Sequence, residues 1–387
     1  MIRRIWWEKE IERLWTKRSI IWLSGVRRSG KTKLCQSLPG SRYLDCELPS
    51  VRRELDDPEA FLKSVKENIL VLDEIHRLND PSLLLKIAAD HFPDLKVIAT
   101  GSSTLGASAK FRDTLTGRKT ELMLTPLCEA DNEFPFYEDR MQRFLKGGLP
   151  GFFLADSRDD REYTEWMESF WARDIMELFR LERRSSFLKF AELLLYQSGG
   201  RFEATSFTSA CSVSRPTIQN YLSILESTFL VHVIRPYHGA SSTEITSTPL
   251  VYGFDTGFVA WSQGVHEITQ KDKGFFWEHL VLNELIARLQ SRNIMTWRDK
   301  QKHEVDFIWA ERGKAPVAIE VKWKADAFEP KGILAFRALH EGNRNLVVAS
   351  DVIEPYTRII AGLEITFCPL NALADLTIAP PTQIQSR

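Results

Sequence analysis

Residues 25–32 combine glycine, lysine and threonine at a spacing suited to binding phosphate. The segment reads Gly-Val-Arg-Arg-Ser-Gly-Lys-Thr and matches the phosphate-loop pattern G-x-x-x-x-G-K-[ST] at every fixed position. Its glycines allow a tight curl in which successive N–H groups point at phosphate oxygens. In such a loop Lys31 contacts the β- and γ-phosphates, and the Thr32 hydroxyl coordinates Mg²⁺. The sequence therefore predicts a nucleotide site that takes ATP and Mg²⁺.

The candidate nucleotide-binding residues are the loop and the residue that follows it. They are Gly25, Val26, Arg27, Arg28, Ser29, Gly30, Lys31, Thr32 and Lys33. An apolar run at 20–23 predicts a strand before the loop, and 33–38 predicts a helix after it. This is the setting that the motif requires. A glycine-rich turn without a ligand is the alternative, but it does not account for the Lys-Thr pair in this setting.

Two carboxylates follow a second apolar run. Residues 69–72 are Ile-Leu-Val-Leu and predict a strand buried on both faces, as in a parallel sheet. Asp73 and Glu74 then stand at its C-terminal end, where ligands bind in open α/β sheets. This arrangement matches the second acidic motif of phosphate-loop ATPases. Asp73 is therefore predicted to hold Mg²⁺, and Glu74 to polarise the attacking water.

Two further polar side chains are candidates to contact the γ-phosphate. The run at 95–100 predicts a strand, and Ser102 just after it is the candidate sensor. A Gly-Ser turn that only closes the strand is the alternative. Arg118 is a candidate to reach a phosphate, in its own site or in a neighbour's. For this residue the alternative is a solvated surface arginine.

A second group of charged side chains lies in the C-terminal third. The alternation of Glu320, Val321 and Lys322 puts both charged side chains on one face of a predicted strand. Asp306 lies in another predicted strand, and Glu278 on a predicted helix that can approach both. Such carboxylates bind Mg²⁺, and a neighbouring lysine orients or deprotonates water. We predict these four charged residues as catalytic, with Asp306 and Glu320 as metal ligands; the alternative is a degenerate domain that only binds nucleic acid or protein.

The first segment between the two sites is predicted to be helical. The pattern from 128 to 200 predicts a helical lid over the nucleotide. Within it, the Trp-Ala-Arg-Asp-Ile segment places Arg173 and Asp174 among apolar neighbours. Arg173 is interpreted as half of a structural salt bridge, with a contact to nucleotide as the alternative.

Residues 201–240 have the character of a winged helix. Ser214 is placed to cap a second helix whose first turn contains Pro216. The apolar run at 229–234 then predicts a strand. In a DNA-binding version this helix enters the major groove, but here it carries little positive charge. A packing module is therefore an equal alternative.

These motifs resemble two known families. Residues 20–127 resemble the AAA-type ATPases of the archaeal-ATPase or signal-transduction kind, which implies ATP binding with Mg²⁺. The remainder resembles DUF4143, a domain of unknown function usually fused to such ATPases. Asp306 with 320–322 resembles the nuclease core of the PD-(D/E)XK superfamily. One departure concerns the sensor, which is Asn in many related ATPases, whereas only Ser or Thr is available here.

The predicted fold class is α/β. We expect a P-loop parallel-sheet ATPase domain over 1–127, a helical lid over 128–200, a winged-helix-like module over 201–240 and a C-terminal α/β nuclease-like domain over 241–387. A chain of 387 residues is long enough for several such domains.

Composition limits the partners. The net charge of −1 excludes a global basic field that would attract nucleic acid, although a local patch remains compatible with it. Five scattered cysteines without a C-x-x-C pair argue against zinc and disulfides and favour a reducing, cytoplasmic location. The sequence shows no signal peptide and no run of 18 apolar residues, so no membrane partner is expected.

Two functions are compatible with these features. The first is an Mg²⁺-dependent ATPase coupled to a C-terminal domain that binds, and as a nuclease cuts, DNA. The second is an ATP-gated switch whose C-terminal domain binds a protein partner and cuts nothing. A homo-oligomer is a further expectation wherever Arg118 acts in a neighbour's site.

Overall fold

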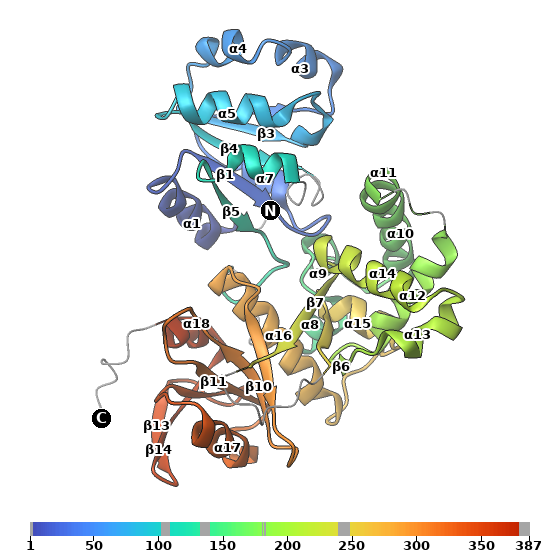
Figure 1. Cartoon of the computed structure of the whole chain (residues 1–387), viewed down its shortest axis with the longest axis vertical. Coiled ribbons are helices and arrows are strands. Elements are labelled where there is room, and N and C mark those ends of the chain that lie inside the picture. Colours follow the sequence, from blue (N-terminus) through green and yellow to red (C-terminus); the bar gives the residue numbers. More distant parts are fainter. Residues whose placement is uncertain are drawn as a thin grey trace.

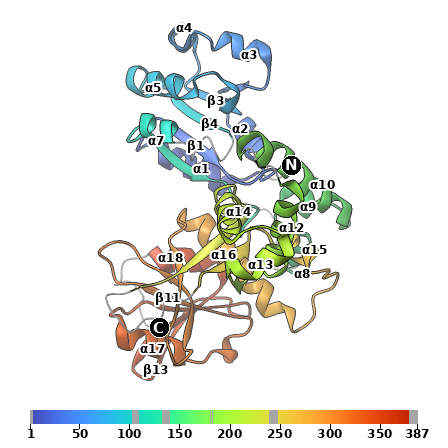
Figure 2. The same ribbon diagram turned by 45° about the vertical axis from the view of Figure 1, so that its right-hand side comes forward.

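The computed structural model describes residues 3–101, 109–131, 140–179, 181, 183–238 and 248–378. An N-terminal α/β unit, blue to cyan in Figure 1, is followed by a set of green helices and then by a large mixed sheet, yellow to red. Figure 2 shows the same three parts after a 45° turn. Within the described ranges, no helix combines the length and hydropathy needed to cross a bilayer.

The N-terminal unit is a five-stranded parallel sheet with strand order β2-β3-β4-β1-β5. Its strands are β1 (Ile20–Ser24), β2 (Ser41–Asp45), β3 (Ile69–Asp73), β4 (Lys96–Thr100) and β5 (Lys119–Met123). Its helices are α1 (Ile5–Trp15), α2 (Lys31–Gln36), α3 (Pro49–Glu54), α4 (Pro58–Ser64), the 3₁₀ helix η1 (Ile75–Arg77), α5 (Pro81–His91) and α7 (Ala109–Leu115). The predicted parallel-sheet α/β fold is confirmed.

Alternating strand residues fill two cores on opposite faces of this sheet. Ile21 and Leu23 of β1 pack with α1 and α2, whereas Ile20 and Trp22 pack with α4, α5 and α7. All five residues of β1 are buried, as expected for a central strand covered by helices on both faces. The sheet therefore holds the segment after β1 in a fixed place.

The middle of the chain is helical, as predicted. Its elements are α8 (Arg140–Lys146), α9 (Pro150–Phe153), α10 (Asp160–Phe170), a π-helical turn η2 (Trp171–Ile175), α11 (Met176–Phe179), α12 (Arg184–Tyr196), α13 (Ala204–Cys211), α14 (Arg215–Ser227) and α15 (Thr256–Ser262). One hydrophobic core runs through them from Leu149 to Phe258, and it also takes in Val26. The expected boundaries at 200 and 240 fall inside this shared core, so lid and following helices pack as one body.

Helices α13 and α14 are joined by a short turn at 212–214, and the winged-helix module stays a prediction. Ser214 accepts the N–H of Thr217 at 3.4 Å, so it caps α14 as predicted. Strands β7 (Val231–Pro236) and β8 (Leu250–Gly253) then pair antiparallel, and β8 also pairs with β6 (Gly200–Arg201). Because β7 also pairs with β9, these strands belong to the large sheet.

The large sheet has nine strands in the order β13-β14-β12-β11-β10-β9-β7-β8-β6. Its remaining elements are α16 (Asp272–Leu289), β9 (Ile294–Arg298), β10 (Glu304–Trp309), β11 (Val317–Lys322), the 3₁₀ helix η3 (Ala325–Ala327), α17 (Lys331–Leu339), β12 (Asn345–Ala349), β13 (Tyr356–Ile360), β14 (Leu363–Cys368) and α18 (Leu370–Ile378). Helices α16 and α18 pack on one face of its central strands, and α17 on the other. The central β10–β11 pair is antiparallel and β11–β12 is parallel.

Helix α16 joins this sheet to the N-terminal unit. Its C-cap residue Gln290 accepts the N–H of Met123 at 2.7 Å and donates to the Met123 carbonyl at 3.1 Å. Glu284, one turn and a half earlier, accepts the N–H of Glu129 at 2.8 Å. The end of β5 is therefore fixed by side chains of the same helix that carries Glu278.

Candidate functional site

The phosphate-loop segment adopts a tight, partly left-handed conformation. Gly25 and Gly30 have φ values of 141° and 99°, and Arg28 has 62°. A side chain at Gly25 would place its Cβ 2.2 Å from the Leu124 carbonyl oxygen. Glycine is therefore required at this position both by conformation and by the close approach of β5. The helix after the loop, α2, runs from Lys31 to Gln36, so it begins two residues before the predicted range of 33–38.

Lys31 lies across the loop. Its ammonium donates to the carbonyl oxygens of Gly25 at 2.8 Å and Val26 at 3.1 Å. Burial lowers the pKa of Lys31, while the nearby charges of Glu74, Asp174 and Asp73 oppose that shift. The Lys31 ammonium therefore lies within the loop, against its carbonyl oxygens, where it is available to a phosphate ligand.

Asp73 lies directly beside the loop. Its carboxylate accepts hydrogen bonds from Thr32 at 2.8 Å and Tyr43 at 2.6 Å, and another from the hydroxyl of Thr100. The Thr32 hydroxyl and the Asp73 carboxylate therefore present neighbouring oxygens, the ligand type that Mg²⁺ prefers. These two residues fit the predicted role of holding Mg²⁺ together with phosphate.

Glu74 follows in an unusual backbone conformation. Its φ of 53° is left-handed, a rare state for a residue with a side chain. Its N–H donates to the Thr100 hydroxyl at 3.1 Å, and its carboxylate lies 3.1 Å from His76 Nδ1. Burial raises the pKa of Glu74, but the hydrogen bond with His76 and the charges of Lys31 and Arg27 outweigh burial, so the pKa falls below its usual value. The carboxylate is ionised at neutral pH, as a group that orients water must be.

A buried arginine at the start of α1 hydrogen-bonds to the backbone of the phosphate loop. Arg4 donates to both oxygens of Asp131 at 2.8 and 2.7 Å, and to the carbonyls of Ser29 at 3.1 Å and Thr125 at 3.0 Å. The Arg4 guanidinium lies 5.0 Å from the Trp7 ring centroid. Sequence reasoning missed this residue because its ion-pair partner is 127 positions away.

The lid reaches the loop through Asp174. Its carboxylate lies 3.4 Å from the Arg27 guanidinium, whereas Arg173 is exposed. Among the described residues, the predicted structural salt bridge of Arg173 is therefore not found, and Asp174 pairs instead with Arg27 of the loop. Burial raises the pKa of Asp174, and the charges of Arg27 and Lys31 oppose that shift.

Arg118 is not brought to the phosphate site of its own chain. Arg118 precedes β5, which runs parallel to β1. It therefore lies at the N-terminal end of the strands, whereas the phosphate loop follows the C-terminal end of β1. Its guanidinium donates to Asp90 at 2.7 and 3.1 Å. The interpretation of Arg118 as a phosphate contact in its own site is thus contradicted by its position; a role in a neighbour's site stays a prediction. Ser102, the candidate sensor, lies outside the described residues.

The C-terminal cluster forms as predicted. Lys322 Nζ lies 2.7 Å from Glu320 and 3.4 Å from Asp306. Burial and the Asp306 charge raise the pKa of Glu278 to about 7 and that of Glu320 to about 8. Helix α16 and strands β10 and β11 therefore bring all four predicted side chains into one electrostatic group.

The cluster also contains a residue that the sequence did not reveal. Tyr252 of β8 donates its hydroxyl to Glu278 at 2.5 Å. The ammonium of Lys322 lies against both Asp306 and Glu320, and across the described residues no group of three or more His, Cys, Asp or Glu side chains could hold a metal ion. The assignment of Asp306 and Glu320 as Mg²⁺ ligands stays a prediction.

Comparison with known proteins agrees with the N-terminal site. Residues 17–131 match the AAA domain family. Residues 137–269 and 273–371 match two domains of unknown function, DUF8612 and DUF4143. The AAA domain and DUF4143 predicted from the motifs are thus both confirmed, whereas the nuclease resemblance stays a prediction.

Two mycobacterial proteins match most of this chain. The uncharacterized proteins Rv2008c of Mycobacterium tuberculosis and Mb2031c of Mycobacterium bovis are each 25% identical over 314 residues, which is 78% of this chain and 70% of each relative. Among solved structures, the Walker-type ATPase PABY2304 of Pyrococcus abyssi is 17% identical with a TM-score of 0.44, covering 68% of this chain and 96% of its own. The STAND protein PH0952 of Pyrococcus horikoshii is 12% identical with a TM-score of 0.26, covering 73% and 46%.

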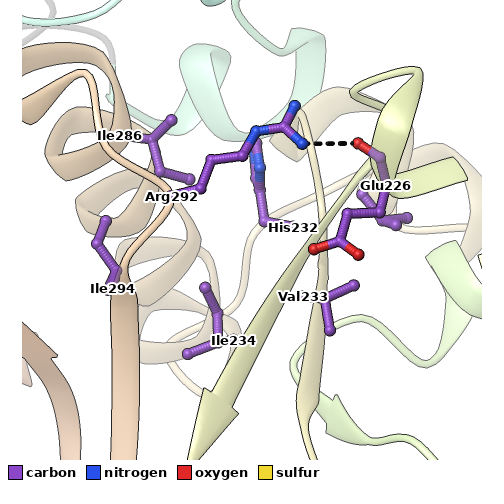
Figure 3. A pocket seen from close by; sticks show the side chains of 8 residues that line it. Glu226, His232, Val233, Ile234, Ile286, Arg292 and Ile294 are labelled. Carbon is purple, nitrogen blue, oxygen red and sulfur yellow. Dashed lines mark hydrogen bonds between the residues drawn. The ribbon is translucent and has the colours of Figure 1, made fainter. Parts of the chain in front are cut away.

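A small cavity lies where strand β7 and helix α16 meet, below the AAA domain. It is lined mainly by aliphatic side chains. Figure 3 shows Arg292 reaching over His232 to the backbone carbonyl of Glu226, at 2.9 Å. Burial lowers the pKa of His232 to about 3, so the imidazole is neutral. This cavity is an apolar junction between elements and is separate from the phosphate-binding loop.

Proposed function

We propose that this chain is an Mg²⁺-dependent ATPase. The observation that supports it best is the continuous connection from Thr32 through Asp73 and Thr100 to Glu74, beside a loop with phosphate-binding geometry. These groups are held in place by the sheet, since Asp73 ends β3 and Thr100 ends β4. Preorganised groups of this kind need little rearrangement when charge develops on a phosphate.

Each side chain has a distinct role in this proposal. The loop N–H groups and Lys31 bind the phosphates, and Thr32 with Asp73 holds the metal ion. Mg²⁺ bound with ATP supplies neutralisation of phosphate charge. Glu74 accepts a hydrogen bond from water and orients it toward the γ-phosphate, and the left-handed backbone at this residue aims its carboxylate.

The binding step is tested by Lys31→Ala, measured by titration calorimetry with ATP and Mg²⁺. We expect affinity to be lost, because Lys31 supplies the positive charge in the curl of the loop. Lys66→Ala removes an exposed lysine of the same domain and serves as the control. Unchanged ATP affinity in Lys31→Ala would exclude the phosphate-loop assignment.

For the C-terminal domain we propose that it binds nucleic acid and, in addition, cleaves it. The convergence of Glu278, Asp306, Glu320 and Lys322 supports this proposal. Wild type and Asp306→Ala are compared on plasmid and single-stranded DNA, with Mg²⁺ or Mn²⁺ and with or without ATP. Products formed only by wild type support cleavage; identical products, or none from either protein, exclude it.

The second candidate is an ATP-gated switch that cuts nothing. It is favoured by the ammonium of Lys322 between the two carboxylates and by α16, which carries Glu278 and also binds the end of β5 through Gln290. In this case ATP changes the affinity for a protein partner. Absence of cleavage, together with an ATP-dependent change in protection of α16 amides from hydrogen exchange, would favour the switch.

A further inference from the structure

The lid and the phosphate loop meet at one ion pair. The Asp174 carboxylate lies 3.4 Å from the Arg27 guanidinium, and about a quarter of each side chain is exposed. The two residues are 147 positions apart, so this contact depends on how the lid folds back onto the AAA domain. Val26, next to Arg27, packs in the hydrophobic core of the lid.

A π-helical turn presents Asp174 to the loop. The turn η2 runs from Trp171 to Ile175, between α10 and α11. Trp171 and Ile175 are both buried, which fixes its orientation, whereas Arg173 points to solvent. Single π turns inside helices are frequent at functional sites, because the extra residue changes the direction of the side chains.

Positive and negative side chains gather around the contact between Arg27 and Asp174. Arg27 and Lys31 contribute two cations, and the charges of Glu74, Asp73 and Asp174 all act on Lys31. The Nε of Arg27 is buried and has no hydrogen-bond acceptor. The arginine therefore has an unused donor in a loop built for phosphate, while its only ion-pair partner among the described residues is the lid carboxylate.

We propose that Asp174 competes with the phosphates of a bound nucleoside triphosphate for Arg27, so that nucleotide binding breaks the contact between loop and lid. This inference rests on the proposed nucleotide binding. Carboxylate and phosphate are both anions, and each repels the other at the distances found inside such a site. Asp174 is thus a positioning residue that makes the lid respond to phosphate charge.

The decisive variant is Asp174→Asn, which keeps the size of the side chain and removes its charge. We expect ATP and inorganic tripolyphosphate to bind about three- to tenfold more tightly, because a competing anion is gone. A residue with only a structural role would lower affinity on substitution. Glu168→Gln removes an exposed charge from the same lid and should leave affinity unchanged. Equal or weaker binding by Asp174→Asn would overturn the proposal.

A double-mutant cycle assigns the effect to Arg27. Arg27→Gln should weaken binding, and adding Asp174→Asn to it should give a smaller gain than in wild type. An equal gain in both backgrounds would overturn the role of Arg27. In wild type, ATP should also speed hydrogen exchange of the amides at 171–175; unchanged or slower exchange would contradict release of the lid.

The outcomes separate this inference from the proposed function. If wild-type protein binds neither ATP nor tripolyphosphate, the nucleotide site itself is wrong. If wild type binds both and Lys31→Ala does not, the site is right, and the Asp174→Asn result then decides the inference alone.

Discussion

The hydroxyl of Thr100 donates a hydrogen bond to the Asp73 carboxylate and accepts the backbone N–H of Glu74. One side chain at the end of β4 therefore connects the proposed metal ligand to the proposed water-orienting residue at the end of β3. The polar side chain that the structure shows beside Asp73 is thus that of Thr100, the last residue of β4, and the role of Ser102 stays a prediction.

We expect Thr100→Val to lower kcat for ATP hydrolysis about ten- to hundredfold, since a hydrogen bond to the charged Asp73 is lost and the partly buried N–H of Glu74 is left unpaired. The Kd for ATP should change little, because Lys31 and the loop backbone, which are proposed to bind the phosphates, do not contact Thr100. Thr100→Ser keeps the hydroxyl and should retain most activity. Loss of ATP binding in Thr100→Val, or full activity, would contradict this role.

Arg4 is expected to stabilise the loop through a buried ion pair. Arg4→Gln leaves the buried Asp131 carboxylate without its partner, so we expect unfolding free energy to fall by about 3–5 kcal/mol. Chemical denaturation measures it. Adding Asp131→Leu should recover part of this loss, because no unpaired charge is then buried. If the single variant were as stable as wild type, the supporting role of Arg4 would be excluded.

The sequence alone was sufficient to predict those parts of the site that depend on local backbone geometry. The loop at 25–32, the strand before it and the position of Asp73 all follow from short patterns, and the structure places Asp73 2.8 Å from Thr32. The alternation in β11 likewise placed Glu320 and Lys322 on one face. Short-range periodicity predicts the strands and the helix that carry these residues, and ligand-binding residues then gather at the carboxyl ends of the parallel strands.

Contacts between distant segments could not be predicted in this way. Asp174 meets Arg27 only because the π turn and the lid core orient it, and Tyr252 reaches Glu278 from a strand of a different segment. The prediction that Arg118 reaches the phosphate of its own chain was wrong, because the sequence before β5 does not show at which end of the strands this residue lies. The location of each of these side chains depends on how helices and strands pack against one another, which cannot be predicted from sequence periodicity.

The position of Arg118 leads to a further prediction. Arg118→Gln should leave the Kd for ATP unchanged, because the guanidinium binds Asp90 at the far edge of the sheet. Steady-state hydrolysis at several protein concentrations provides the check. A large drop in kcat that grows with protein concentration would instead show that Arg118 acts in a neighbouring copy.

Stability should fall as pH rises through the neutral range. Burial raises the pKa of Glu284 to about 8 from an ordinary value of 4.5, so between these values the folded chain holds a proton that the unfolded chain has lost. Since the folded state then binds more protons, its stability decreases with pH. Glu278 and Glu320 act in the same direction.

Glu284→Gln tests this dependence. The amide cannot ionise, and its oxygen can still accept the N–H of Glu129. We expect a smaller fall in Tm between pH 5 and pH 9 than in wild type, whereas Glu267→Gln, at an exposed position, should behave as wild type. A wild-type slope in Glu284→Gln would show that this carboxyl is ionised in the fold.

The central claim is that this chain hydrolyses ATP with Glu74 as the residue that orients water. The most direct measurement is phosphate release by wild type and Glu74→Gln, with the Kd for ATP determined on the same samples. The account predicts a loss of about a hundredfold or more in kcat with nearly unchanged Kd. Equal turnover by the two proteins, or no ATP-dependent phosphate release by wild type, would contradict it.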